Sequence, residues 1–118
     1  MRPIILDLIG DPAWQTVAIA QGAKYVPLVG TDFWRATPND AAVIVDSRNR
    51  YEEGLELISR LAVASVPGCA RVLITERESA KEHERAYRAG TTRVVLMGLE
   101  ESGHAAVLSE VAGVARRR

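Results

Sequence analysis

Three carboxylates of this sequence interrupt or follow apolar runs, at positions where they could bind a cation. Asp46 directly follows residues 43–45, while Asp7 and Asp11 lie within and just after the run that begins at Ile4. Hard cations such as Mg²⁺ prefer oxygen ligands, which carboxylates supply. The alternatives are structural: Asp7 could make only a local hydrogen bond in a strand, and Asp11 could only cap a helix.

One basic residue of the chain is close to Asp46 in the sequence. Arg48 follows it by two residues, so its guanidinium could form an ion pair with the Asp46 carboxylate and replace an external cation. The alternative is a loop arginine that lies in solvent.

Other common kinds of functional site are not indicated. The sequence has no GxGxxG and no GxxxxGK phosphate-binding pattern. Its single cysteine, Cys69, can form no intrachain disulfide. His83 and His104 have no metal-ligand partner at suitable spacing, and we expect both to be surface or half-buried residues. No Ser-His-Asp order or pair of glutamates stands out, so we expect no enzyme.

The composition bounds the class of protein. The 118 residues fit one domain, residues 1–118, and the 47% that are apolar are enough for one core. Basic and acidic residues number 15 each, so no net charge directs the chain to nucleic acid or to an anionic membrane. The lone cysteine suits a cytoplasmic location, and no apolar stretch approaches the roughly 20 residues of a membrane span. The arginines at 116–118 could be a frayed helix end or the start of a linker to an output domain.

Five apolar runs alternate with helical patterns along the chain. We expect strands at residues 4–9, 25–29, 41–45, 70–75 and 93–97. Helix starts are marked by Asp11-Pro12, by two capping-box pairs and by Ser102, and helix ends by two glycines. The pairs are Asn49 with Glu52 and Ser79 with Glu82, and the glycines are Gly22 and Gly90. The segment 30–40, with Trp34 and Pro38, has room for at most one helical turn.

The order of the strands can be predicted from one residue. Nearly continuous Val, Ile and Leu in short strands is typical of a parallel sheet with helices on both faces. Pro27 lies inside the second strand and cannot donate to a strand ladder, so this strand should be at an edge. The flavodoxin-like order 2-1-3-4-5 meets this condition, whereas the nucleotide-binding order 3-2-1-4-5 would bury the strand. We therefore expect an α/β, doubly wound five-stranded sheet of the first kind.

The spacing of several short motifs resembles the receiver domain of bacterial response regulators. The third strand ends in Asp46 and is followed by Gly54-Leu55-Glu56-Leu57, the fourth ends in Thr75, and Ala89-Gly90 precedes the fifth. The resemblance covers nearly the whole chain apart from a shortened second helix. It implies that Asp46 is at the phospho-acceptor position and Thr75 at the position of the switch Ser/Thr.

The sequence departs from this family where the family binds Mg²⁺ and phosphate. The adjacent acidic pair after the first strand is replaced by Ile9-Gly10, or by Asp7 in a second register. Met97 replaces the lysine that ends the fifth strand, and Glu76 replaces a small residue. The pocket expected around the phospho-acceptor-like Asp46 consists of Asp7, Asp11, Ser47, Arg48, Thr75, Glu76 and Met97. We expect Asp46 to be a poor or absent phospho-acceptor, with no metal and no cofactor; if Mg²⁺ is bound, Asp11 and Asp46 are its ligands.

The leading hypothesis is a regulatory pseudo-receiver that signals through protein contacts. Its partner would be another protein or a fused output domain, with no direct nucleic-acid contact and no membrane. A homodimer through the family's fourth helix, fifth strand and fifth helix is one form of such a contact, and Arg85 and Arg88 could form pairs across it. The alternatives are a receiver that is phosphorylated on Asp46, with Asp7 or Asp11 binding Mg²⁺, and a flavodoxin-like domain that binds a small ligand.

Overall fold

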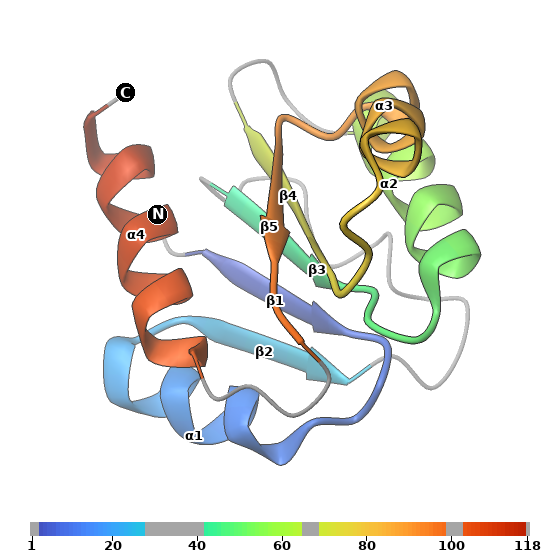
Figure 1. The fold of residues 1–118 in the computed structure, drawn as a ribbon. Helices are drawn as coiled ribbons and strands as arrows, with labels where there is room; N and C mark the ends of the chain where they lie inside the picture. The colour runs from blue at the N-terminus through green and yellow to red at the C-terminus, as the bar shows by residue number, and fades with distance from the viewer. Residues whose placement is uncertain (1–2, 28–41, 65–68, 99–102, 118) are drawn as a thin grey trace.

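The strands form a single parallel sheet, and helices lie on both of its faces (Figure 1). The computed structural model describes residues 3–27, 42–64, 69–98 and 103–117. Its strands are β1 (Ile4–Asp7), β2 (Lys24–Pro27), β3 (Ala42–Asp46), β4 (Ala70–Thr75) and β5 (Arg93–Leu96). Its helices are α1 (Pro12–Gln21), α2 (Tyr51–Ala64), α3 (Ala80–Ala89) and α4 (His104–Arg117).

The strand order is β2-β1-β3-β4-β5, which confirms the predicted flavodoxin-like topology. β2 is an edge strand, and its Pro27 is paired in register with Asp7 of β1. Pro27 alone was therefore enough to choose between the two strand orders. β4 has its predicted limits, and the limits of the other strands lie within two residues of the predicted ones, which is the usual uncertainty of element boundaries.

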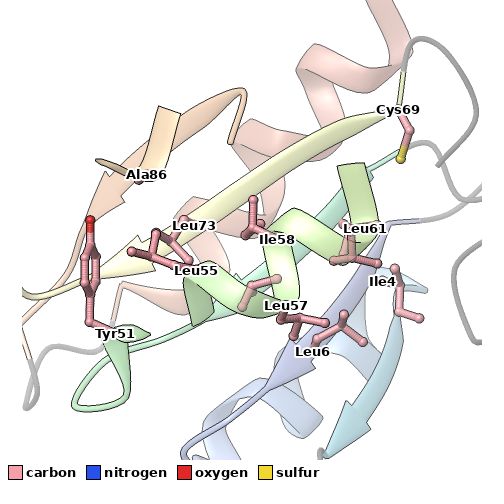
Figure 2. Packing of buried hydrophobic residues seen from close by; sticks show 12 residues of the cluster. Ile4, Leu6, Tyr51, Leu55, Leu57, Ile58, Leu61, Cys69, Leu73 and Ala86 are labelled. Atoms are coloured by element: carbon pink, nitrogen blue, oxygen red, sulfur yellow. The ribbon is translucent and has the colours of Figure 1, made fainter. Parts of the chain in front are cut away.

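Two apolar clusters fill the two sides of the sheet. Side chains of α2, among them Leu57, Ile58 and Leu61, pack on Ile4 and Leu6 of β1 and form the cluster seen in Figure 2. The second cluster lies under α1 and α4. Its members come from alternate strand positions and from the two helices. They include Ile5, Trp14, Ile44, Ile74, Leu108 and Val111. Alternation along each strand therefore supplies both cores, as expected for a parallel sheet covered on both faces.

Most of the predicted helix ends are present. The Asp11 side chain accepts a hydrogen bond from the Ala13 N–H at the start of α1, and Gly22 ends that helix with a φ of 72°. Ser79 caps α3, and Gly90 ends it with a φ of 118°. These positive φ angles favour glycine.

One predicted helix start is wrong. Asn49 does not form a capping box with Glu52: it has a φ of 63°, and α2 begins at Tyr51. Its backbone N–H is instead bound by the Glu76 carboxylate, 2.5 Å away. A contact between the ends of β3 and β4 therefore replaces the local cap, and such a contact cannot be read from sequence spacing.

Some predictions lie outside the described residues. They concern the short segment 30–40 with Trp34 and Pro38, and the cap at Ser102. None of the helices in the described part of the chain is both long and apolar enough to cross a membrane.

Candidate functional site

The candidate site lies at the carboxyl ends of β1 and β3. The two strands are neighbours, and their last residues, Asp7 and Asp46, are paired in register. In open α/β sheets this edge, near the change in strand order, is where ligands bind. Packing explains the glycine of the sequence motif after β3. A Cβ added to Gly54 would lie 2.3 Å from the Cβ of Ser47, so glycine lets α2 approach the end of β3.

Arg48 forms a fully buried ion pair with Asp46. The Arg48 Nε lies 3.0 Å from Asp46 Oδ1, and its Nη2 lies 2.7 Å from Asp46 Oδ2. Both side chains are 0% exposed. The backbone N–H of Arg48 donates to Asp46 Oδ1 as well, at 3.1 Å. The ion pair considered from the sequence is therefore present, and the alternative of an arginine in solvent is wrong.

The same guanidinium is bound by two further groups. Its Nη2 lies 2.8 Å from Asp11 Oδ2, and its Nη1 donates to the carbonyl oxygen of Gly98 at 2.9 Å. Burial lowers the pKa of Arg48, but the hydrogen bonds and charges of Asp46 and Asp11 outweigh it, so the net shift is upward. Arg48 is therefore a permanent cation that lies between two carboxylates.

Two aromatic residues complete what we call the Arg48 cluster, defined as Asp11, Trp14, Asp46, Arg48 and His104. The indole Nε1–H of Trp14 donates to Asp46 Oδ2 at 2.6 Å. The His104 ring lies edge-on to the Trp14 ring, with centroids 4.5 Å apart, and its Nε2 is 2.6 Å from Asp11 Oδ2.

The expectation that His104 is a surface or half-buried residue is wrong, because its side chain is 4% exposed. Trp14 was also missed as a site residue. A topological signal could have found both: in the order 2-1-3-4-5, the helices that follow the first and last strands cover the same face. Residues near the starts of these two helices, here Trp14 and His104, therefore lie together at the carboxyl end of β3.

Asp11 both caps α1 and belongs to the cluster. Burial raises the pKa of Asp11, but hydrogen bonds from the Ala13 N–H, His104 and Arg48 outweigh burial and hold that pKa below its usual value. Asp11 is thus an ionised partner of Arg48 at neutral pH.

Asp7, the register neighbour of Asp46, is bound by other groups. Its Oδ1 accepts the N–H groups of Ile9 and Gly10, and its Oδ2 accepts the Tyr25 hydroxyl at 2.8 Å. Burial raises the pKa of Asp7, and the Tyr25 hydrogen bond only partly offsets this. Burial and Asp7 together raise the pKa of Tyr25 to about 12. The local hydrogen bonds considered for Asp7 are therefore present.

The other predicted pocket residues lie at the same edge of the sheet and contact other groups. The Ser47 hydroxyl donates to the carbonyl oxygen of Ile74, and Thr75 Oγ1 accepts the N–H of Arg77. Met97 is buried in the cluster under α1 and α4. Glu76 binds the Asn49 N–H, as described above.

The residues present do not fit Mg²⁺. Each carboxylate oxygen of Asp7, Asp11 and Asp46 already accepts at least one hydrogen bond from the protein. Octahedral Mg²⁺ would need several of these oxygens to face one point. In the described residues, no group of three or more His, Cys, Asp or Glu side chains could hold a metal ion.

Comparisons of the sequence with known proteins find no relative. No family model matches the chain, and no curated protein matches it.

Several solved structures share the fold. A response regulator from Thermotoga maritima has a TM-score of 0.69 and 15% identity, and the match covers 98% of this chain and 99% of that one. A response regulator protein from Burkholderia pseudomallei, with a phosphorylated aspartic acid, a calcium ion and citrate, has a TM-score of 0.67, 14% identity and coverage of 99% and 72%. The pilus assembly protein CpaE from Caulobacter crescentus has a TM-score of 0.61, 16% identity and coverage of 97% and 99%. The chain therefore has the fold of response-regulator receiver domains, which the CpaE structure shares.

Proposed function

We propose that this domain is a regulatory module of receiver type that acts through protein contacts, without Mg²⁺-dependent phosphorylation of Asp46. One observation carries the proposal: a buried Arg48 guanidinium binds Asp46 and Asp11 at once. The proposal includes a cytoplasmic location, a protein partner or a fused output domain, and no enzymatic activity. It includes no direct nucleic-acid contact and no cofactor.

Electrostatics supports this proposal over a phosphorylated receiver. Phosphoryl transfer is catalysed mainly by positioning and by cations that offset the charge on the phosphoryl oxygens. Asp46 could act as nucleophile only after it left Arg48 and the Trp14 indole, and separating a buried ion pair is costly. The carboxylate of Glu76 near the same edge would also repel an incoming dianion.

Incubation with a small-molecule phosphodonor and Mg²⁺ tests the proposal. We expect the intact mass to stay that of the unmodified chain under conditions that phosphorylate a conventional receiver used as a positive control. Asp46→Asn serves as the matched negative control. Addition of one phosphoryl group that is lost in Asp46→Asn would contradict the proposal.

A homodimer is one form of the protein contact that we propose. Its candidate surface consists of α3, β5 and α4, which take the places of the family's fourth helix, fifth strand and fifth helix. Arg85 and Arg88 are already paired within the chain, Arg85 with Glu52 and Arg88 with Glu84. Exposed ion pairs of this kind contribute little stability. Tyr87 on α3 and Leu96 on β5 are large apolar residues that are 50% and 49% exposed, so we assign the contact to them rather than to the arginines.

A further inference from the structure

Polar contacts hold Gly98, which follows β5, and His104, which begins α4. The Arg48 Nη1 donates to the Gly98 carbonyl oxygen, just after β5, and His104, the first residue of α4, lies 2.6 Å from the Asp11 carboxylate. The two contacts are linked through Arg48, because its Nη2 and His104 Nε2 bind the same oxygen, Oδ2 of Asp11.

The described part of α4, residues 104–111, buries fewer apolar side chains than α2 does. In α2 the buried apolar side chains are those of Tyr51, Leu55, Leu57, Ile58 and Leu61. Among the described side chains of α4, which extend to Val111, the buried apolar ones are Leu108 and Val111. Because burial of apolar surface is the main stabilising contribution, these two side chains and the polar contact of His104 both contribute to holding the described part of α4.

A second group of contacts joins α4 to α1 at the surface. Gln21 of α1 donates to the Ala105 carbonyl oxygen and accepts from the Ser109 hydroxyl, at 3.1 and 3.2 Å. Both bonds are exposed, so water can replace them at little cost. The Arg48–Asp46 pair in the cluster is fully buried, so it has no such replacement.

We propose that the Arg48 cluster is a conformational device that holds α4 against α1 and the sheet, and that α4 is the element released when the cluster opens. Its release uncovers part of the second apolar cluster around Trp14, which α4 covers at Leu108 and Val111. The ion pair at the end of β3 therefore controls an apolar surface on the α1–α4 face (Figure 1). This inference goes beyond the proposed function, because it holds whether or not Asp46 accepts a phosphoryl group.

Amide hydrogen exchange measured by mass spectrometry under native conditions tests the proposal. The key variant is Arg48→Met with Asp46→Asn, which opens the cluster but leaves no unpaired buried charge at the end of β3. We expect protection of the α4 amides to fall by at least about tenfold, the scale of a lost charged hydrogen bond, while α2 protection changes by less than about threefold. Neither a cation nor a phosphodonor is present, so the result is independent of the phosphorylation test.

Two controls make the test specific. Gln21→Ala removes the surface contacts of α4 and leaves the cluster intact, so its α4 protection should stay within about threefold of the wild-type value. If the double variant does not fold, His104→Ala is the second test, because it removes the direct contact of α4 with Asp11 and keeps the Arg48–Asp46 pair. The proposal is overturned by unchanged α4 protection in the folded variant, by an equal loss in α2 and α4, or by an equal loss in Gln21→Ala.

Discussion

At the scale of single residues, the guanidinium of Arg48 is the feature on which the site depends. A buried charge is tolerated only when its donors are satisfied and an opposite charge is close. The Nε and both terminal nitrogens of Arg48 donate to Asp46, Asp11 or the Gly98 carbonyl oxygen, which meets this condition. Arginine suits the position better than lysine, since its planar group can bind two carboxylates and a carbonyl at once.

Replacement of Arg48 tests this dependence. Arg48→Met should lower the free energy of unfolding by about 3–5 kcal/mol, because it leaves the buried Asp46 carboxylate without a counter-charge. Arg48→Met with Asp46→Asn should recover at least half of that loss, since no buried charge is then unpaired at this position. Urea unfolding followed by circular dichroism measures both values. A single variant as stable as the wild type would contradict the account.

The buried Asp7 gives a prediction that depends on pH. Because the pKa of Asp7 is raised in the folded protein, the folded state binds its proton more tightly than the unfolded chain does. Ionised Asp7 therefore lowers stability, and this loss is complete only above the raised pKa. Asp7→Asn should raise the free energy of unfolding at pH 7 by on the order of 1 kcal/mol.

Urea unfolding of both chains at several pH values measures the effect. The gain from Asp7→Asn should shrink as the pH falls through the raised pKa of Asp7, and it should vanish below about 4, the value for an unfolded chain. A gain of the same size at every pH would show that packing, not ionisation, is the cause.

The sequence predicts part of the site at this scale. The pairing of Arg48 with Asp46 could be proposed because they are two positions apart, and the capping role of Asp11 follows from the proline after it. The partnership of Asp11 with His104 joins residues 93 positions apart. Only the folded sheet brings them together, so a periodic pattern that placed His104 on a helix could not show that its side chain is buried.

At the scale of elements, the residues that begin and end a helix were predicted correctly where they act on their own helix. Asp11 with Pro12, Gly22, Ser79 and Gly90 all act within one turn of their own helix. The capping box predicted for Asn49 and Glu52 is absent because Glu76, at the end of another strand, binds the N–H of Asn49. Tertiary contacts override local propensity in such cases.

The α3 and β5 elements carry the prediction about self-association. In sedimentation over a range of concentrations, we expect the wild-type chain to approach the mass of a dimer. Replacing Tyr87 and Leu96 by serine should keep the chain monomeric, because it removes the exposed apolar area at the proposed contact. Ile19→Ser is the control: Ile19 is 77% exposed on α1, so this variant should associate like the wild type. A monomeric wild type, or association unaffected by the double replacement, would refute this surface.

At the scale of the whole molecule, the topology was predictable because it follows from repeated, short-range patterns. Alternating apolar strands and helices predict a parallel sheet covered on both faces, and Pro27 selects the strand order. The charge balance of the site was predictable only in outline. The missing lysine and acidic pair indicated a weak cation site, and Arg48 was a candidate for the internal cation, whereas the other three members of its cluster required the fold.

The most direct test of the central claim, that Arg48 occupies the site in place of a metal and a phosphoryl group, uses the indole N–H of Trp14, which donates to Asp46. The chain has a second tryptophan, so Trp34→Phe identifies the Trp14 signal in a ¹H–¹⁵N spectrum. On titration with Mg²⁺ and beryllofluoride, this resonance should keep its position, because Asp46 stays bound to Arg48 and Trp14. A saturable shift of the resonance that is absent in Asp46→Asn would contradict the account.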